Sequence, residues 1–341
     1  MSQITISKSL AAKALAILAV IMLHIESTLP WSITRTSYTQ ELSTALDQLN
    51  RFSVPVFIFL SGYGLSVSTK TPIKLIDFYK RRFIRIIPAY IFWSIIIYIL
   101  LSVIPEWNTS QNIAWHRLPT VLILGQADYH LYFIPVIIMY YLVFPLGYYL
   151  NQHHPRKFLT SAFLLQALYL VVLHLNLIAE FFPQWQNSDY WQYFNPLAWI
   201  GYFGLGISLS SEVFSQEIKK ISRYIPWLIL FSYCILVINA IFSIYSGTDP
   251  LLAQKFTRIP VMAYATVFCL WIYSGKLWQT LSENKVLVQI GIHSLTIYYV
   301  HTLVIRVVSG LIKHQISWES TGYVFISILL AAYIQHRLKL A

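Results

Sequence analysis

The run IIPAYIFWSIIIYILLSVI, residues 86–104, decides the class of fold. It carries no charged side chain, and its length is close to the roughly 20 apolar residues that cross a bilayer as a helix. The whole chain shares this character: of 341 residues, 57% are hydrophobic and 11% are charged, and the mean hydropathy is +0.60. Soluble domains carry about 25% charged residues. The sequence therefore excludes a soluble globular protein and predicts an all-α, polytopic membrane protein.

Similar apolar runs recur along the chain, separated by short polar or Pro/Gly-containing segments. Connections this short leave no room for a second domain, so we expect residues 1–341 to form one transmembrane domain. The sequence predicts a bundle of about ten transmembrane helices, at 14–30, 51–69, 86–104, 129–150, 158–178, 193–211, 224–245, 258–275, 287–308 and 320–337.

The charges give this bundle an orientation. The chain has 24 Lys and Arg against 13 Asp and Glu, a net charge of +11. Alternating the ten helices places 17 of the basic residues on one side and 7 on the other. Basic residues concentrate in cytoplasmic segments, so we expect both termini in the cytoplasm and no nucleic-acid partner. Cys234 and Cys269 both fall inside predicted helices, so neither a disulfide framework nor a metal site is expected.

The first predicted helix contains the most informative pair of residues. Lys13 and His24 are 11 positions apart, which places them on one helix face with a rise of about 16 Å between them. A long anionic ligand from the cytoplasm could contact Lys13 and present its far end to His24. That imidazole could act as a general base or as a transient acyl acceptor. An equally good interpretation is structural: Lys13 fixes the orientation of the helix as a cytoplasmic positive charge, and His24 is a packed, hydrogen-bonded residue.

A basic run precedes the third predicted helix. Lys80, Arg81, Arg82 and Arg85 lie within FYKRRFIRIIP, residues 78–88. Arg82 and Arg85 share a helix face, and their guanidinium groups suit forked hydrogen bonds to phosphate oxygens. The run is also typical of a juxtamembrane cluster that binds anionic lipid headgroups.

Other polar residues inside predicted helices mark a possible substrate path, because ionisable and polar groups are costly in a bilayer. Ser61 lies among small residues of the second helix, and Glu26 lies two positions beyond His24, pointing elsewhere. In the ninth helix, Gly291, Ser294, Tyr298 and His301 recur at three- and four-residue steps and form one polar stripe.

Together these segments resemble the acyltransferase-3 family of bacterial integral membrane proteins. The matching elements follow in order along nearly the whole chain: Lys13 with His24, VPVFIFLSGYGL (54–65), Arg82 and Arg85 with IIP (86–88), HLYFIPVIIMYYLVFPL (130–146), and IGIHSLTIYYVH (290–301). The chain departs from many members by having Lys13 where they have Arg, which keeps the charge but loses the bidentate fork.

The resemblance implies transfer of an acyl group, commonly acetyl, from cytoplasmic acyl-CoA to a hydroxyl of a cell-envelope or exported carbohydrate or similar acceptor. In that picture His24 is catalytic, and Lys13, Arg82 and Arg85, with Lys80 and Arg81 beside them, engage the phosphates of the donor. Acyl-CoA is a co-substrate, and no tightly bound cofactor is expected. The expected location is the bacterial plasma membrane, with lipids, the acceptor and other envelope-polysaccharide synthesis proteins as partners.

Several alternatives stay open from the residues. The acyl group passes either directly to the acceptor or through an acyl-histidine. Some members carry an appended extracytoplasmic hydrolase-like domain; because Ala341 follows soon after the tenth predicted helix, we expect this bundle to act alone or with a separate protein. The chain could instead be a transporter or flippase for polysaccharide or lipid-linked sugar, or a lipid-binding scaffold.

Overall fold

The computed structural model describes residues 6–28, 37–69, 71–104, 107, 115–175, 177, 189–275 and 277–311, and within these ranges it contains helices and no strand. The helices are α1 Ile6–Thr28, α2 Ser37–Leu49, η1 Asn50–Phe52, α3 Ser53–Ser68, α4 Leu75–Val103, η3 Trp115–Arg117, α5 Leu118–Leu124, α6 Phe133–His153, α7 Pro155–His174, α9 Asp189–Phe194, η5 Pro196–Ala198, α10 Ile200–Leu209, α11 Glu212–Ile221, α12 Ile225–Tyr245, α13 Pro250–Ala253, α14 Ile259–Ser274, α15 Leu277–Glu283, α16 Lys285–Ile292 and α17 Ser294–Leu311.

Among the described residues, six helical segments are long and apolar enough to cross a membrane. They are Ile6–Glu26, Gln40–Ser68, Leu75–Val103, Phe133–His153, Pro155–His174 and Ile225–Tyr245. The helices α16 and α17 would add a seventh if they count as one span bent by 78°. A helix satisfies all its own backbone hydrogen bonds, which is why an apolar run in lipid adopts it. The all-helical membrane character predicted from the sequence is therefore confirmed.

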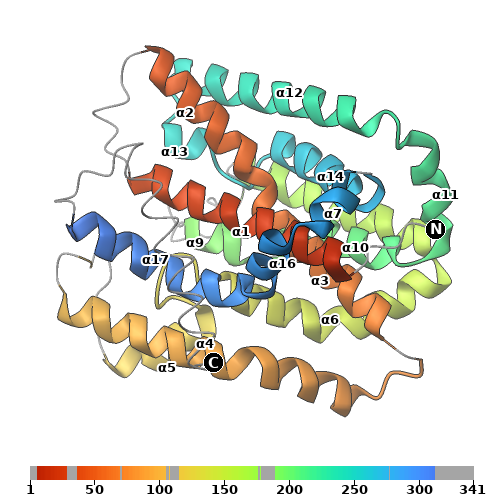
Figure 1. The fold of residues 1–341 in the computed structure, drawn as a ribbon, viewed down its shortest axis with the longest axis horizontal. Coiled ribbons are helices and arrows are strands. Elements are labelled where there is room, and N and C mark those ends of the chain that lie inside the picture. Colours follow the sequence, from red (N-terminus) through yellow and green to blue (C-terminus); the bar gives the residue numbers. More distant parts are fainter. Residues whose placement is uncertain are drawn as a thin grey trace.

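The long helices run roughly alongside one another, and α1 lies near the middle of this view (Figure 1). The helix α12 lies along one edge of this view, and α4 and α5 lie along the opposite edge. Burial agrees with this arrangement, since Ile17, Ile21 and Ile25 of α1 are fully buried, whereas Trp227 and Phe242 of α12 are each 70% exposed. Exposed large apolar side chains on a peripheral helix are typical of a lipid-facing surface.

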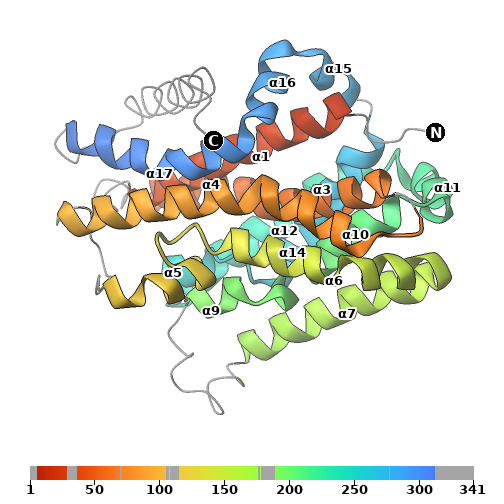
Figure 2. The ribbon, with the colours of Figure 1, turned by 90° about the horizontal axis from the view of Figure 1, so that it is seen from below.

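One end of the bundle gathers the basic segments. The N-terminal ends of α1, α4 and α7 lie at this end together with α11 (Figures 1 and 2). These segments contain the basic run of α4, Arg156 and Lys157 at the start of α7, and Lys219 and Lys220 of α11. The structure thus collects at one end several of the charges that the alternation of helices predicts to be cytoplasmic; we call it the basic end.

Close backbone contacts bring the central helices together. A methyl group added to Gly206 of α10 would lie 2.1 Å from the carbonyl oxygen of Phe59 in α3. One added to Gly291 of α16 would lie 2.0 Å from the carbonyl oxygen of Leu10 in α1. Small residues that let helix backbones approach are a common basis of packing in membranes, where burial from water contributes little.

Two predicted helices are interrupted, so their prediction as single helices was wrong. The sixth, 193–211, is divided among the end of α9, η5 and the ten-residue α10. Pro196 follows Asn195, whose side chain accepts a hydrogen bond from the backbone N–H of Leu197 and starts a new helix there. The ninth, 287–308, is broken at His293. The tenth, 320–337, lies outside the described residues, so the total of ten stays a prediction.

Candidate active site

Three histidines from distant parts of the chain meet beside α1. His24 comes from α1, His130 from the segment before α6, and His301 from α17. Their ring centroids are 5.1 Å apart for His24 and His301, 4.9 Å for His130 and His301, and 6.3 Å for His24 and His130. The ring of Tyr129 lies 5.0 Å from that of His24. His130 and His301 are buried, and Tyr129 is half exposed.

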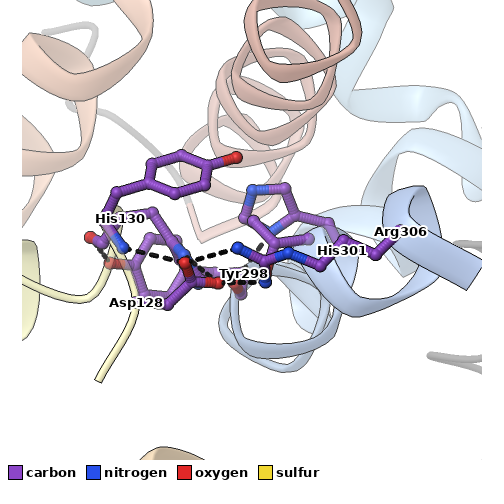
Figure 3. Close-up of polar contacts among 7 residues, drawn as sticks. Asp128, His130, Tyr298, His301 and Arg306 are labelled. Carbon is purple, nitrogen blue, oxygen red and sulfur yellow. Dashed lines mark hydrogen bonds and ion pairs between the residues drawn. The ribbon is translucent and has the colours of Figure 1, made fainter. Parts of the chain in front are cut away.

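A buried ion pair holds the segment with His130 against α17. The Nη1 and Nη2 atoms of Arg306 donate hydrogen bonds to the two carboxylate oxygens of Asp128 at 2.6 and 2.8 Å (Figure 3). Thr302 also donates to Asp128 at 3.0 Å, and the hydroxyl of Tyr298 donates to the carbonyl oxygen of His130. Burial acts to raise the pKa of Asp128, but the hydrogen bonds and charges of Arg306 and His130 together outweigh it and hold that pKa well below its usual range.

His301 has a defined tautomer in this arrangement. Its Nδ1 lies 2.7 Å from the carbonyl oxygen of Tyr298, and because a carbonyl can only accept, Nδ1 carries the hydrogen. The lone pair then lies on Nε2, which is buried and has no hydrogen-bond partner among the described residues. An imidazole with a buried lone pair near two other imidazoles is suited to accept or relay a proton.

The cationic residues of α1 and α4 meet at the basic end. Arg85 is near enough to Lys13 for their like charges to repel, and the charges of Arg81 and Arg85 repel that of Arg82 in the same way. The guanidinium of Arg82 lies over the Phe78 ring at 5.1 Å and donates to Ser68 at 3.1 Å. In the described part of the chain, no ion pair joins Lys13, Arg82 or Arg85 to a carboxylate. Adjacent cations without a carboxylate favour an anionic ligand.

Hydroxyl groups lie between the cationic residues and the histidines. Tyr141 of α6 lies within hydrogen-bonding reach of Ser61 and near the charges of Arg82 and Arg85. Tyr299 of α17 is close to Tyr141 and Tyr90, and its buried hydroxyl has no hydrogen-bond partner among the described residues. These groups could hydrogen-bond to a polar chain extending from the basic end toward His24.

The structure separates the predicted site residues into three groups, and Ser61 lies beside Tyr141 near the cationic group. His24 and His301 lie together, with Tyr298 in contact. Lys13, Arg82 and Arg85 lie together, and Lys80 and Arg81 are exposed beside them. Ser294 remains on α17 with Tyr298 and His301, but Gly291 lies on α16 beyond the break, so the predicted four-residue stripe was wrong at that position. Glu26 belongs to a separate group near Asp47 and Arg51.

Asp128, His130 and Arg306 were missing from the predicted site. A signal for them existed, since ionisable residues next to apolar runs are candidate site residues by default. Their pairing spans 178 positions, and local spacing gives no information about such a contact. Within the described residues no group of His, Cys, Asp or Glu has an arrangement suited to a metal ion.

Comparison with known protein families supplies an independent observation. The model of the acyltransferase-3 family, described as an acyltransferase domain, matches residues 11–336. The chain belongs to the acyltransferase-3 family. The match covers both the histidines and the cationic residues of this family member, and it supports a membrane acyltransferase. No curated protein and no solved structure matches the chain.

Proposed function

We propose that the protein transfers an acyl group, commonly acetyl, from cytoplasmic acyl-CoA to a hydroxyl of a cell-envelope or exported carbohydrate or similar acceptor. The observation that carries this proposal is that α1 joins two groups: the three histidines around His24, and the cations around Lys13, which pair with no carboxylate among the described residues. The bundle would lie in the bacterial plasma membrane as about ten spans, with the basic end and both termini in the cytoplasm. Its partners there would be membrane lipids and other envelope-polysaccharide synthesis proteins.

The donor would bind with its phosphates at Lys13, Arg82 and Arg85. Lys80 and Arg81 would add to the positive field at the membrane surface. The pantetheine arm carries amide groups, which would hydrogen-bond to Tyr141 and Tyr299 on the way to His24. The rise of about 16 Å between Lys13 and His24 leaves room for such an extended arm.

At the histidines, the acceptor hydroxyl would lose its proton to His24 as its oxygen attacks the thioester carbonyl. The new C–O bond forms, the C–S bond breaks, and the CoA thiolate takes the proton back from the imidazolium. In the alternative route, a nitrogen of His24 first attacks the thioester and CoA leaves as its thiolate; the hydroxyl oxygen then takes the acyl group from the nitrogen, and the hydroxyl proton passes to the thiolate. His301, whose Nε2 carries the lone pair, would take or relay the proton in either route.

The test uses purified protein in lipid nanodiscs with acetyl-CoA, following release of the CoA thiol. His24→Ala should abolish turnover while leaving acetyl-CoA binding intact. His153→Ala, an exposed histidine at the end of α6, is the matched control and should behave as wild type. Radiolabel that stays on the protein after mixing with [¹⁴C]acetyl-CoA without acceptor would identify the acyl-histidine route.

The alternatives have distinct outcomes. Protein that neither binds nor consumes any acyl-CoA, yet moves glycan across liposomes, would be a transporter and would overturn this proposal. For a lipid-binding scaffold, Arg82→Ala and Arg85→Ala would change only membrane association. For the transferase each should weaken acetyl-CoA binding about tenfold or more, because charge-assisted hydrogen bonds contribute about 1.5–3 kcal/mol each. Arg156→Ala, an exposed arginine at the same end, should leave acetyl-CoA binding unchanged.

A further inference from the structure

Beyond His24, toward the end of α1 opposite Lys13, lies a carboxyl group that the proposed reaction does not use. Glu26 is 8% exposed, and neither of its carboxylate oxygens has a hydrogen-bond partner among the described residues. A buried carboxylate can accept several hydrogen bonds and is costly when it accepts none. Within the described part of the chain Glu26 thus has no donor, so its two oxygens can accept hydrogen bonds from a bound ligand.

The neighbours of Glu26 form a polar group on α2 and η1. Arg51 donates to both carboxylate oxygens of Asp47, at 2.9 and 2.6 Å, and both residues act electrostatically on Glu26. Gln48 donates to Asp47 at 2.7 Å, while its own side-chain carbonyl oxygen is fully buried and has no hydrogen-bond partner in the described part of the chain. Three acceptor oxygens, two on Glu26 and one on Gln48, thus lack donors.

Aromatic rings adjoin this polar group. The guanidinium of Arg51 interacts electrostatically with the hydroxyl groups of Tyr132 and Tyr193. The rings of Tyr132 and Tyr193 stack with centroids 5.7 Å apart, and the guanidinium of Arg51 lies 4.6 Å from the centroid of the Phe256 ring. The combination of unsatisfied acceptors with flat apolar ring faces suits a ligand that has several hydroxyl donors and an apolar C–H face.

The polar group is also electrostatically coupled to the histidines. Arg51 interacts electrostatically with both Glu26 and His24. Tyr132 interacts in the same way with Tyr298, whose ring contacts those of His130 and His301. A ligand hydrogen-bonded to Glu26 would therefore lie near His24 on the side away from the basic end. Donor and acceptor would approach the histidines from opposite ends of α1.

We propose that Glu26, Asp47, Gln48, Arg51, Tyr132 and Tyr193 form the acceptor-binding site, and that its ligand is a carbohydrate. The inference rests on the proposed function, and it adds the position of the acceptor and the groups that recognise it. Glu26 and Gln48 accept hydrogen bonds from ring hydroxyls, Arg51 donates to a ring or hydroxyl oxygen, and the tyrosines cover the C–H face of the sugar.

The experiment measures sugar binding and acetyl-CoA consumption separately on the full chain in nanodiscs. The probes are tritiated maltotriose and tritiated tri-N-acetylchitotriose. Wild-type protein should bind at least one of them, and Glu26→Gln should weaken that binding at least tenfold with acetyl-CoA binding unchanged. Glu217→Gln, an exposed acid of α11, is the matched control and should bind sugar as wild type does.

Two results would overturn the acceptor site: neither sugar binds to wild-type protein, as expected if water alone fills the space at Glu26, or Glu26→Gln binds sugar as tightly as wild type. If Glu26→Gln does not fold, Tyr193→Leu replaces it, and unchanged sugar affinity in that variant also overturns the site. Sugar binding that depends on Glu26 in a protein that never consumes acetyl-CoA would support the site and refute the transferase.

Discussion

At the scale of single residues, the site combines a predictable part with an unpredictable one. Lys13 and His24 share one helix, so a fixed rise and turn per residue were enough to place them on one face. The contact of Asp128 with Arg306 depends on how a loop before α6 meets α17, and no local period contains that information. The Asp128 carboxylate remains ionised because Arg306 and His130 together hold its pKa down, and its ion pair with Arg306 fixes the segment with His130 against α17.

Breaking this ion pair should destabilise the protein. Removing Arg306 in Arg306→Ala leaves the buried Asp128 carboxylate without its bidentate partner, and loss of one member of a buried ion pair costs about 3–5 kcal/mol. We expect a lower melting temperature in detergent, measured by tryptophan fluorescence. The exposed pair of Arg156 and Glu217, 75% and 49% exposed, provides the control, because Arg156→Ala should change stability by less than about 1 kcal/mol. Equal effects of the two substitutions would contradict this role of the ion pair.

The tautomer of His301 leads to a separate kinetic prediction. His301→Phe removes the lone pair on Nε2 while keeping a ring in the space, so kcat should fall about 10²–10⁴-fold, the usual contribution of a general acid or base. The KM for acetyl-CoA should change little, because the donor phosphates bind near Lys13. A change in KM with kcat intact would show instead that His301 only shapes the donor path.

At the scale of helices, the long apolar segments could be predicted and the interruptions could not. Composition identified α4, α6, α7 and α12 because each is a long apolar run. It did not indicate the break at His293, since no proline intervenes and the apolar run resumes at Leu295. That break brings Gly291 against the backbone of α1, a tertiary contact that local propensity does not encode.

Two glycines test the packing of α3 against α10. In Gly206→Ala the new methyl group meets the backbone of Phe59 and Tyr63 at 2.1 and 2.7 Å, so α10 must move away, and such overpacking costs about 1–3 kcal/mol. Gly64→Ala meets nothing within 4 Å and should stabilise α3 by about 0.5–1 kcal/mol. Melting temperatures of the two variants should shift in opposite directions. Equal shifts in melting temperature would show that α10 can move away from α3 without loss of stability.

At the scale of the whole molecule, the collection of basic segments at one end predicts an orientation. In a background with Cys234→Ala and Cys269→Ala, a membrane-impermeant maleimide applied to intact cells should label Thr248→Cys and leave Lys220→Cys unlabelled. These residues flank the two ends of α12, and both are exposed. Lysis should make Lys220→Cys reactive. Labelling of Lys220→Cys in intact cells would show that the orientation is opposite to the predicted one.

Arg51 and Arg306, near the histidines, also affect whether protons can leak through the bundle. Neighbouring imidazoles in a membrane protein resemble a proton relay, and a continuous relay would dissipate the proton gradient. The charges of Arg51 and Arg306 act on His24, and fixed cations near a narrow path exclude protons and other cations. We therefore expect liposomes containing wild-type protein to hold a pH gradient, followed with a trapped pH-sensitive dye, and those containing Arg51→Gln to lose it faster. The same arginines that order the site would thus keep a transferase from becoming a proton channel.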